Sequence, residues 1–270
     1  MINSKFLPIT LFVFIVLFFF KAFIFENKLP IPSDTIVGLY HPFRDFYARE
    51  YPNGIPFKNS LITDPVRQQY PWRDLVISIA KKFELPLWNP YNFSGTPLLA
   101  NFQSAVFYPL SLLFFIAPFN IGWAVLIMLQ PLLAGIFLYW YLRNLSIHQL
   151  ASFLGSFVFA FCGFSVAWME WGTILHVGLW LPLILLAIDK IFFYLVSENS
   201  KLSAKGGSAS GRKIQNSKLP IRQAQGRQLK SKNLLIWNVI FIFSLVSSFF
   251  AGHLQIFFYL YIFSTVYFLA

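Results

Sequence analysis

The chain has 270 residues, of which 57% are hydrophobic and 20% aromatic, while only 11% are charged. Ordinary soluble domains carry about 25% charged residues, so this composition excludes a typical soluble domain and indicates an integral membrane protein. The net charge of +11 comes mostly from residues 196–233, where nine Lys and Arg residues accompany one Glu. Because this excess lies in one segment, we expect no nucleic-acid partner. The single cysteine, Cys162, excludes a disulfide framework and a cysteine-based metal site.

Continuous apolar runs recur along the chain. A run of about 20 residues is long enough to cross a hydrocarbon core as an α-helix, and helices satisfy their own backbone groups in lipid. The runs do not alternate with polar residues, so the predicted fold class is an all-α polytopic membrane bundle. The last run reaches the end of the sequence, and we expect the N-terminal part of a longer protein. The predicted spans are residues 6–25, 121–142, 150–169, 173–195, 234–252 and 254–270.

The basic segment 196–233 sets the predicted topology. It is rich in Gly, Ser and Gln, a composition that does not bury enough surface to fold, and Lys and Arg accumulate in cytoplasmic loops. We therefore predict a disordered cytoplasmic loop. Counting spans back from it places the N-terminus inside and residues 26–120 outside. Residues 104–118 then begin and end on the outer face, and we predict an interfacial helix there.

Two similar polar stretches lie in the predicted outer loop. SDTIVGLYHPFRD (33–45) and TDPVRQQYPWRD (63–74) both begin with a hydroxyl residue and Asp, and both end with Pro, an aromatic residue, Arg and Asp. A carboxylate can take a proton from a hydroxyl or hold a divalent cation. Most loop acids are simply solvated, but Asp34 lies near the first span and Asp64 precedes a proline that fixes the backbone. Asp64 and Asp34 are therefore the candidate catalytic residues, and either is the ligand if a divalent cation takes part.

Aromatic and amide residues follow in PLWNPYNFSGTPLLANFQSAVFYPLSLLF, residues 86–114. Flat rings beside hydrogen-bonding groups suit a sugar, although an aromatic belt at the membrane surface has the same composition. Ionisable residues near the predicted outer ends of spans are paired or functional. The candidate substrate-binding residues are Arg44, Arg67, Gln69, Tyr70, Arg73, Trp88, Asn89, Tyr91, Asn101, Gln103, Glu170, His176 and His253.

Five segments occur in an order that resembles the YfhO family of bacterial membrane proteins: TDPVRQQYPWRD, PLWNPYNFSGTPLLANFQSAVFYPLSLLF, FCGFSVAWMEWG, LPLILLAID and AGHLQIFFY. That family is similar to the C-type glycosyltransferases (GT-C), which use polyprenyl-phosphate sugars and carry a catalytic acid in the first outer loop. The resemblance implies a GT-C-like bundle in the bacterial cytoplasmic membrane. It also implies that the acid is Asp64 or Asp34, and that Arg67, Arg73 and Arg44 bind the donor phosphate.

The predicted function is transfer of a sugar from a polyprenyl-phosphate donor to a cell-surface polymer or glycolipid acceptor. The reaction would take place beside membrane lipid, on the outer face. A transporter or lipid flippase is the alternative, although transporters place ionisable groups near the bilayer midplane and the charges here gather at helix ends. A non-catalytic envelope-assembly protein that binds surface polymers is a third reading.

Overall fold

The computed structural model describes residues 7–56, 61–206 and 231–270. It is mostly helical, with a single pair of very short strands within these residues. Four helical segments are long and apolar enough to cross a membrane, which confirms the prediction of a mostly helical protein with apolar helices of membrane-spanning length. They are Phe119–Asn144, Gln149–Trp171, Ile174–Val196 and Asn233–Phe250.

Several of these segments consist of more than one helix. Helix α7 (Phe119–Asn144) is continuous, whereas the second segment contains α8 (Gln149–Phe161), α9 (Gly163–Trp168) and the 3-10 turn η4 (Met169–Trp171). The third contains α10 (Ile174–Gly178) and most of α11 (Leu181–Gly206), and the fourth lies in α12 (Ser231–Phe250). The shorter apolar helices are α1 (Leu7–Phe19) and α13 (Leu254–Leu269).

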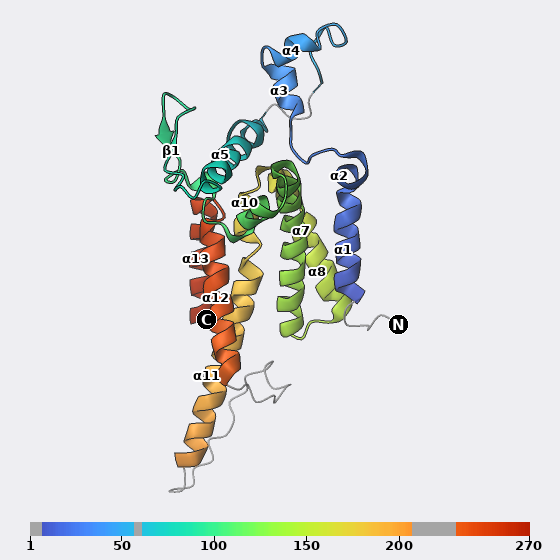
Figure 1. The fold of residues 1–270 in the computed structure, drawn as a ribbon. Coiled ribbons are helices and arrows are strands. Elements are labelled where there is room, and N and C mark those ends of the chain that lie inside the picture. The colour runs from blue at the N-terminus through green and yellow to red at the C-terminus, as the bar shows by residue number, and fades with distance from the viewer. Residues whose placement is uncertain (1–6, 57–60, 207–230) are drawn as a thin grey trace.

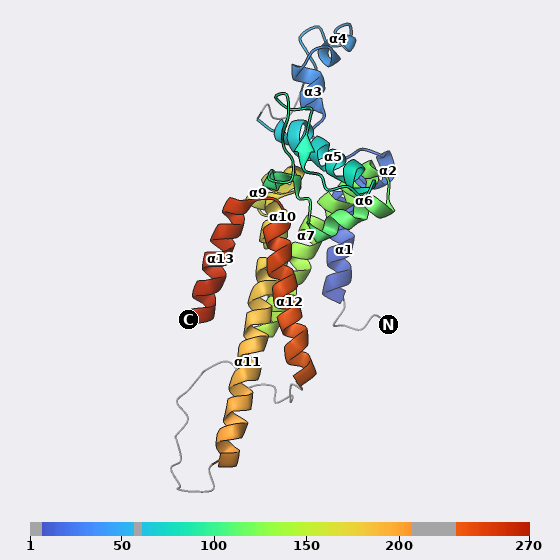
Figure 2. The same ribbon diagram turned by 60° about the vertical axis from the view of Figure 1, so that its left-hand side comes forward.

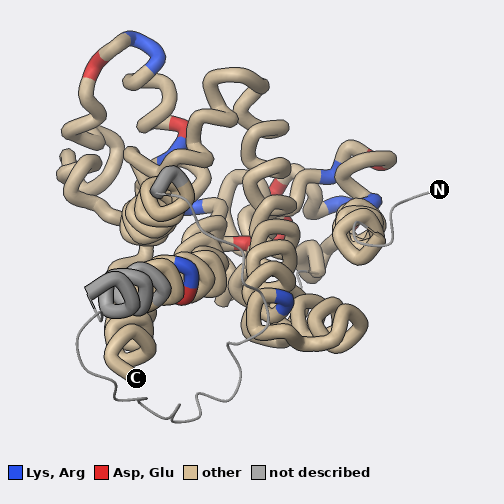
Figure 3. The backbone as a smooth tube through the Cα atoms, turned by 90° about the horizontal axis from the view of Figure 1, so that it is seen from below, with Lys and Arg blue, Asp and Glu red and all other residues tan. Residues whose placement is uncertain are grey.

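Helices α7 and α11 form the centre of the bundle. More than half of the residues in their apolar segments are buried, compared with less than a quarter for the segments of α8 and α12. Helix α7 contacts α1, α8 and α11, and α11 also contacts α12 and α13. The outward faces of α8 and α12 are rich in large exposed apolar side chains, as expected for helices that face lipid. Charged residues are sparse along the described helices (Figure 3).

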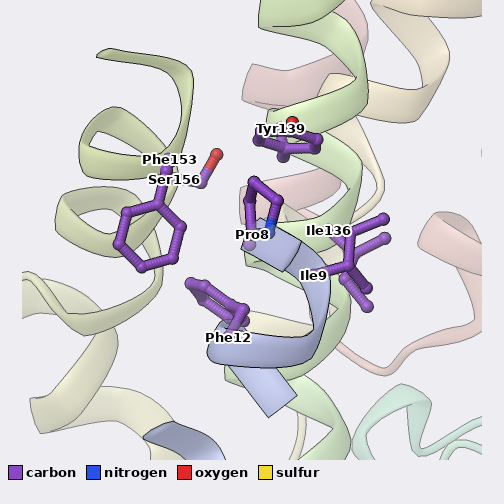
Figure 4. Close-up of a pocket in the computed structure, with 8 residues that line it drawn as sticks. Pro8, Ile9, Phe12, Ile136, Tyr139, Phe153 and Ser156 are labelled. Carbon is purple, nitrogen blue, oxygen red and sulfur yellow. The ribbon is translucent and has the colours of Figure 1, made fainter. Parts of the chain in front are cut away.

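A glycine allows α1 to lie directly against α7. A Cβ atom on Gly135 would come within 2.0 Å of the Phe12 ring, so only glycine fits without displacing that ring. A crevice of about 10 Å³ remains beside this contact (Figure 4), with room for no more than one water molecule. It is a packing gap without room for a ligand. Its lining residues are Pro8, Ile9, Phe12, Gly135, Ile136, Tyr139, Phe153 and Ser156.

Three predicted segments differ from the structure. The predicted span 6–25 is divided, because α1 ends at Phe19 and α2 (Lys21–Glu26) begins after a turn. The predicted interfacial helix 104–118 is three short pieces: η2 (Phe102–Ser104), η3 (Pro109–Leu112) and α6 (Leu113–Ile116). Ala105 is left-handed (φ 49°) and Tyr108 is extended before Pro109, and neither conformation continues a helix.

The predicted disordered loop 196–233 is helical at its start, since α11 continues to Gly206. Ser, Glu, Lys and Ala in this stretch are compatible with helix, and no Gly or Pro occurs between Val196 and Gly206. Residues 207–230, which carry most of the predicted loop, lie outside the described residues.

The polar segments gather at one end of the bundle, opposite the end toward which α11 extends (Figures 1 and 2). This end holds α3 (Asp34–Leu39), α4 (Phe43–Phe46), the π-helical turn η1 (Pro65–Gln69) and α5 (Tyr70–Ala80). Strands β1 (Trp88–Asn89) and β2 (Thr96–Pro97) pair antiparallel beside α5, with Trp88 opposite Pro97. Helices α2 and α10 also lie here, and we call it the α5 end.

Candidate functional site

A groove of about 340 Å³ lies at the α5 end. One wall comes from η1 and α5, and the other from the loop that carries β1. Pockets for small molecules are commonly about 300 Å³ or larger, so the groove has room for one sugar unit. Its lining residues are Arg67, Pro71, Trp72, Asp74, Leu75, Ser78, Asn89, Tyr91 and Asn92.

Helix α5 has two distinct faces. Pro71, Asp74 and Ser78 are spaced three and four residues apart, which places them on one side of the helix, and all three line the groove. Arg73 and Val76 follow the same spacing on the other side, and both are buried. The helix therefore separates an open polar groove from a closed interior.

The second wall, which we call the hairpin wall, is the β1–β2 hairpin (residues 88–97), and Gly95 and Asn89 determine its conformation. Gly95 has a φ of +122°, and a Cβ there would lie 2.6 Å from the Trp88 ring. Asn89 is 3% exposed, and its Oδ1 accepts a hydrogen bond of 2.9 Å from the Tyr91 backbone N–H. This turn leaves the Tyr91 ring 81% exposed at the edge of the groove. Trp88, a predicted substrate ligand, instead packs over the turn of its own hairpin.

We expect Gly95→Ala to disorder this wall. The added methyl group clashes with Trp88 and the positive φ disfavours any Cβ, a combination that costs about 1–3 kcal/mol locally. Limited proteolysis should then cleave residues 88–97 faster than in the wild type. Gly163→Ala is the matched control, because a Cβ there meets nothing within 4 Å. Equal cleavage rates for the two variants would show that Gly95 does not shape the wall.

The groove combines groups that suit a sugar phosphate. Asp74 is an exposed carboxylate, and the Arg67 guanidinium lies 5.3 Å from the Tyr40 ring centroid. Trp72 and Tyr91 supply rings that can stack on the apolar face of a sugar, and Asn92 supplies an amide. A carboxylate can accept a proton from a hydroxyl group, and an arginine can hold a phosphate through paired hydrogen bonds.

A set of polar side chains lies on the other side of α5, which we call the polar junction: the buried Gln69, Arg73, Tyr108 and His176, and the half-buried Gln103. Gln69 Nε2 donates to Gln103 Oε1 at 2.6 Å. His176 Nε2 lies 3.1 Å from the Leu126 carbonyl oxygen, which only accepts, so Nε2 carries the hydrogen. The neutral ring then accepts the Tyr108 hydroxyl at Nδ1, across 2.8 Å. Burial raises the pKa of Tyr108, which keeps that hydroxyl protonated.

Arg73 is the charged member of the polar junction. Its side chain is 1% exposed, and Nη2 donates to the Gly172 carbonyl oxygen at 3.4 Å. Its guanidinium carbon lies 5.9 Å from the Trp123 ring centroid. Burial lowers the pKa of Arg73 to about 10, so it remains a cation at neutral pH.

The predicted site residues thus fall into separate places. The groove contains Arg67, Asn89 and Tyr91, and the polar junction contains Gln69, Arg73, Gln103 and His176. Arg73, a predicted phosphate ligand, is turned away from the groove. The others lie elsewhere: Asp34, Arg44, Asp64, Tyr70, Trp88, Asn101, Glu170 and His253.

The two aspartates predicted to be catalytic do not line the groove. Asp34 begins α3, which projects from the α5 end (Figure 1). Asp64 precedes η1, whose π-helical turn shifts the helical register relative to Asp74. Neither acid joins two other His, Cys, Asp or Glu residues in a possible metal site within the residues that the structure describes. A single carboxylate is a poor cation site, so neither aspartate by itself fits a divalent cation.

Several other predicted ligands have structural contacts. The Tyr70 ring packs against Phe119 and Trp123. Burial is the larger cause that raises the pKa of Tyr70, and the charge of Asp74 raises it further. Asn101 caps η2 by accepting a hydrogen bond from the Gln103 N–H. Arg44 lies on exposed α4, Glu170 in η4, and His253 directly before α13.

The sequence interpretation missed six groove residues: Pro71, Trp72, Asp74, Leu75, Ser78 and Asn92. Helical spacing along YPWRDLVISIA could have placed Asp74 and Ser78 together on one exposed face. The turn composition of NPYNFSG could have indicated a loop that presents Asn92. Comparisons of the chain with protein-family models, with curated proteins and with solved structures gave no match.

Proposed function

We propose that this chain is a membrane glycosyltransferase that moves a sugar from a polyprenyl-phosphate donor to a cell-envelope acceptor. The groove beside α5 is the observation that carries the proposal. It joins a carboxylate, a guanidinium, two aromatic rings and an amide at the end of an apolar helical bundle. A lipid-linked sugar needs this combination, because its tail remains in the hydrocarbon while its head group is polar.

In the proposed reaction, an acceptor hydroxyl attacks the anomeric carbon of the donor sugar. The carboxylate accepts the hydroxyl proton as the new C–O bond forms, and the bond to the lipid phosphate breaks. Negative charge builds on the departing phosphate, and a guanidinium beside it stabilises that charge in the transition state. Asp74 is the carboxylate that the groove supplies, and Arg67 is the guanidinium.

The proposal places the groove on the outer face of the bacterial cytoplasmic membrane, with the N-terminus inside. The acceptor is a surface polymer or a glycolipid, because the groove is open to solvent at the exposed Tyr91 ring. Asp64 and Asp34 are alternative bases, suggested by the family resemblance.

Transfer in reconstituted vesicles tests the proposal. The protein is supplied with a panel of labelled polyprenyl-phosphate hexoses and with envelope acceptors, and Asp64→Asn and Asp34→Asn are measured beside the wild type. We expect transfer by the wild type and by both variants within about threefold, because surface changes away from a site have small effects. Loss of transfer in one variant would move the base to that acid. No transfer from any donor would contradict the proposed function.

A further inference from the structure

The polar junction holds a buried cation without a counter-ion. Arg73 forms no ion pair with a carboxylate of the described residues, and its Nε and Nη1 atoms have no hydrogen-bond partner there. Burying an unpaired charge lowers stability, and an apolar side chain of similar volume is often neutral or stabilising in its place. Stability alone therefore does not account for an arginine at this position.

The contacts of Arg73 are directional and connect α5 to two other parts of the bundle. It reaches the Gly172 carbonyl, directly after η4, and the Trp123 ring of α7. One turn earlier, Tyr70 packs edge-on against the same Trp123 ring, with centroids 5.1 Å apart. Apolar contacts are non-directional, whereas a planar guanidinium that donates a hydrogen bond and lies near a ring fixes an orientation.

The rotation of α5 decides what faces the groove. Adjacent residues of an α-helix differ by about 100° around its axis, so Arg73 and Asp74 necessarily point in different directions. With Arg73 held in the junction, Asp74 and Ser78 line the groove. The apolar residues of α5 on the junction side, such as Val76 and Ile77, add buried contacts that lack the directionality of a hydrogen bond.

We infer that Arg73 is a positioning residue, which fixes the rotation of α5 on the membrane helices and thereby sets Asp74 toward the groove. The consequence for catalysis rests on the proposed function, whereas the geometry does not depend on it. Arg73 itself does not line the groove and touches no substrate. The shape of the groove therefore depends on the contacts that Arg73 makes with α7 and with the segment that follows η4.

Crosslinking across the groove tests this inference without any substrate. Cysteines replace Ser78 on the α5 wall and Asn92 on the hairpin wall in a Cys162→Ser background, and a short bis-maleimide reports their approach. We expect Arg73→Met to slow crosslinking by about fivefold or more, since α5 samples other rotations, with a melting temperature equal to or above that of the parent. Arg73→Lys, which keeps the charge but lacks the planar fork, should give an intermediate rate.

Val76→Ala is the control on the same buried face. It removes packing volume, so we expect a lower melting temperature with an unchanged crosslinking rate. Arg73→Met at the parental crosslinking rate would overturn the inference. So would a slower rate accompanied by a fall in melting temperature as large as that of Val76→Ala, because Arg73 would then be an ordinary packing residue. Failure of sugar transfer by the wild type would affect neither result.

Discussion

Asp74→Asn is expected to lower the turnover of sugar transfer by a factor of about 10²–10⁴, the usual contribution of a general base. The amide has nearly the same shape as the carboxylate but does not take the acceptor proton. Substrate contacts with Trp72, Tyr91 and Arg67 remain, so KM should change little while kcat falls. Initial rates over a range of donor and acceptor concentrations in vesicles separate the two constants.

Asp45→Asn is the matched control for this experiment. Asp45 is also an exposed acid of the polar segments, but it lies in α4, and its Oδ2 is 2.8 Å from Nδ1 of His41. We expect wild-type turnover, because α4 contributes nothing to the groove lining. If Asp74→Asn retained full turnover, or if both variants lost it equally, Asp74 would not be the base.

The helical membrane class was predictable from the sequence because it depends on the length of apolar runs. The predicted span 121–142 corresponds to α7, which covers Phe119–Asn144. Breaks inside apolar runs were not predictable in this way. The backbone is extended at Cys162 and left-handed at Gly172, and hydropathy does not register either change of direction.

The candidate site was predictable in composition but not in arrangement. The sequence predicts that the polar stretch 63–74 lies in a loop, whereas residues 70–80 form α5, with Arg73 buried on one face and Asp74 exposed on the other. Arginine is rarely buried without a partner, so its type alone predicts exposure. The bond between Tyr108 and His176 joins residues 68 positions apart, and no local pattern predicts it.

The similarity between residues 33–45 and 63–74 does not extend to their structures. Asp34 begins the short helix α3, and the chain then turns into α4. Asp64 instead precedes a π-helical turn that leads directly into the longer helix α5. The longer helix is amphipathic and packs on the bundle, which explains why only the second stretch contributes to the groove and to the polar junction.

Trp123→Ala is expected to lower the free energy of unfolding by about 3–5 kcal/mol, the usual cost of removing a buried aromatic side chain. Trp123 is 0% exposed. Its Nε1 donates to the Pro30 carbonyl oxygen at 3.4 Å, and its ring contacts Tyr70 and lies near Arg73. One side chain of α7 thus supports both the start of the polar segment and α5. Unfolding in mixed micelles, followed by circular dichroism, measures the change.

Two further variants separate the contribution of the buried ring of Trp123 from that of its hydrogen bond to Pro30. Trp140→Ala removes the same side chain from the same helix, but Trp140 is 44% exposed, so the loss should be below about 1 kcal/mol. Trp123→Phe keeps a ring and loses the hydrogen bond to Pro30, which contributes about 0.5–1.5 kcal/mol. Equal losses for Trp123→Ala and Trp140→Ala would mean that the α5 end does not depend on this tryptophan. If Trp123→Ala is strongly destabilising, it should also slow crosslinking between positions 78 and 92, because the support for Arg73 is removed together with the ring.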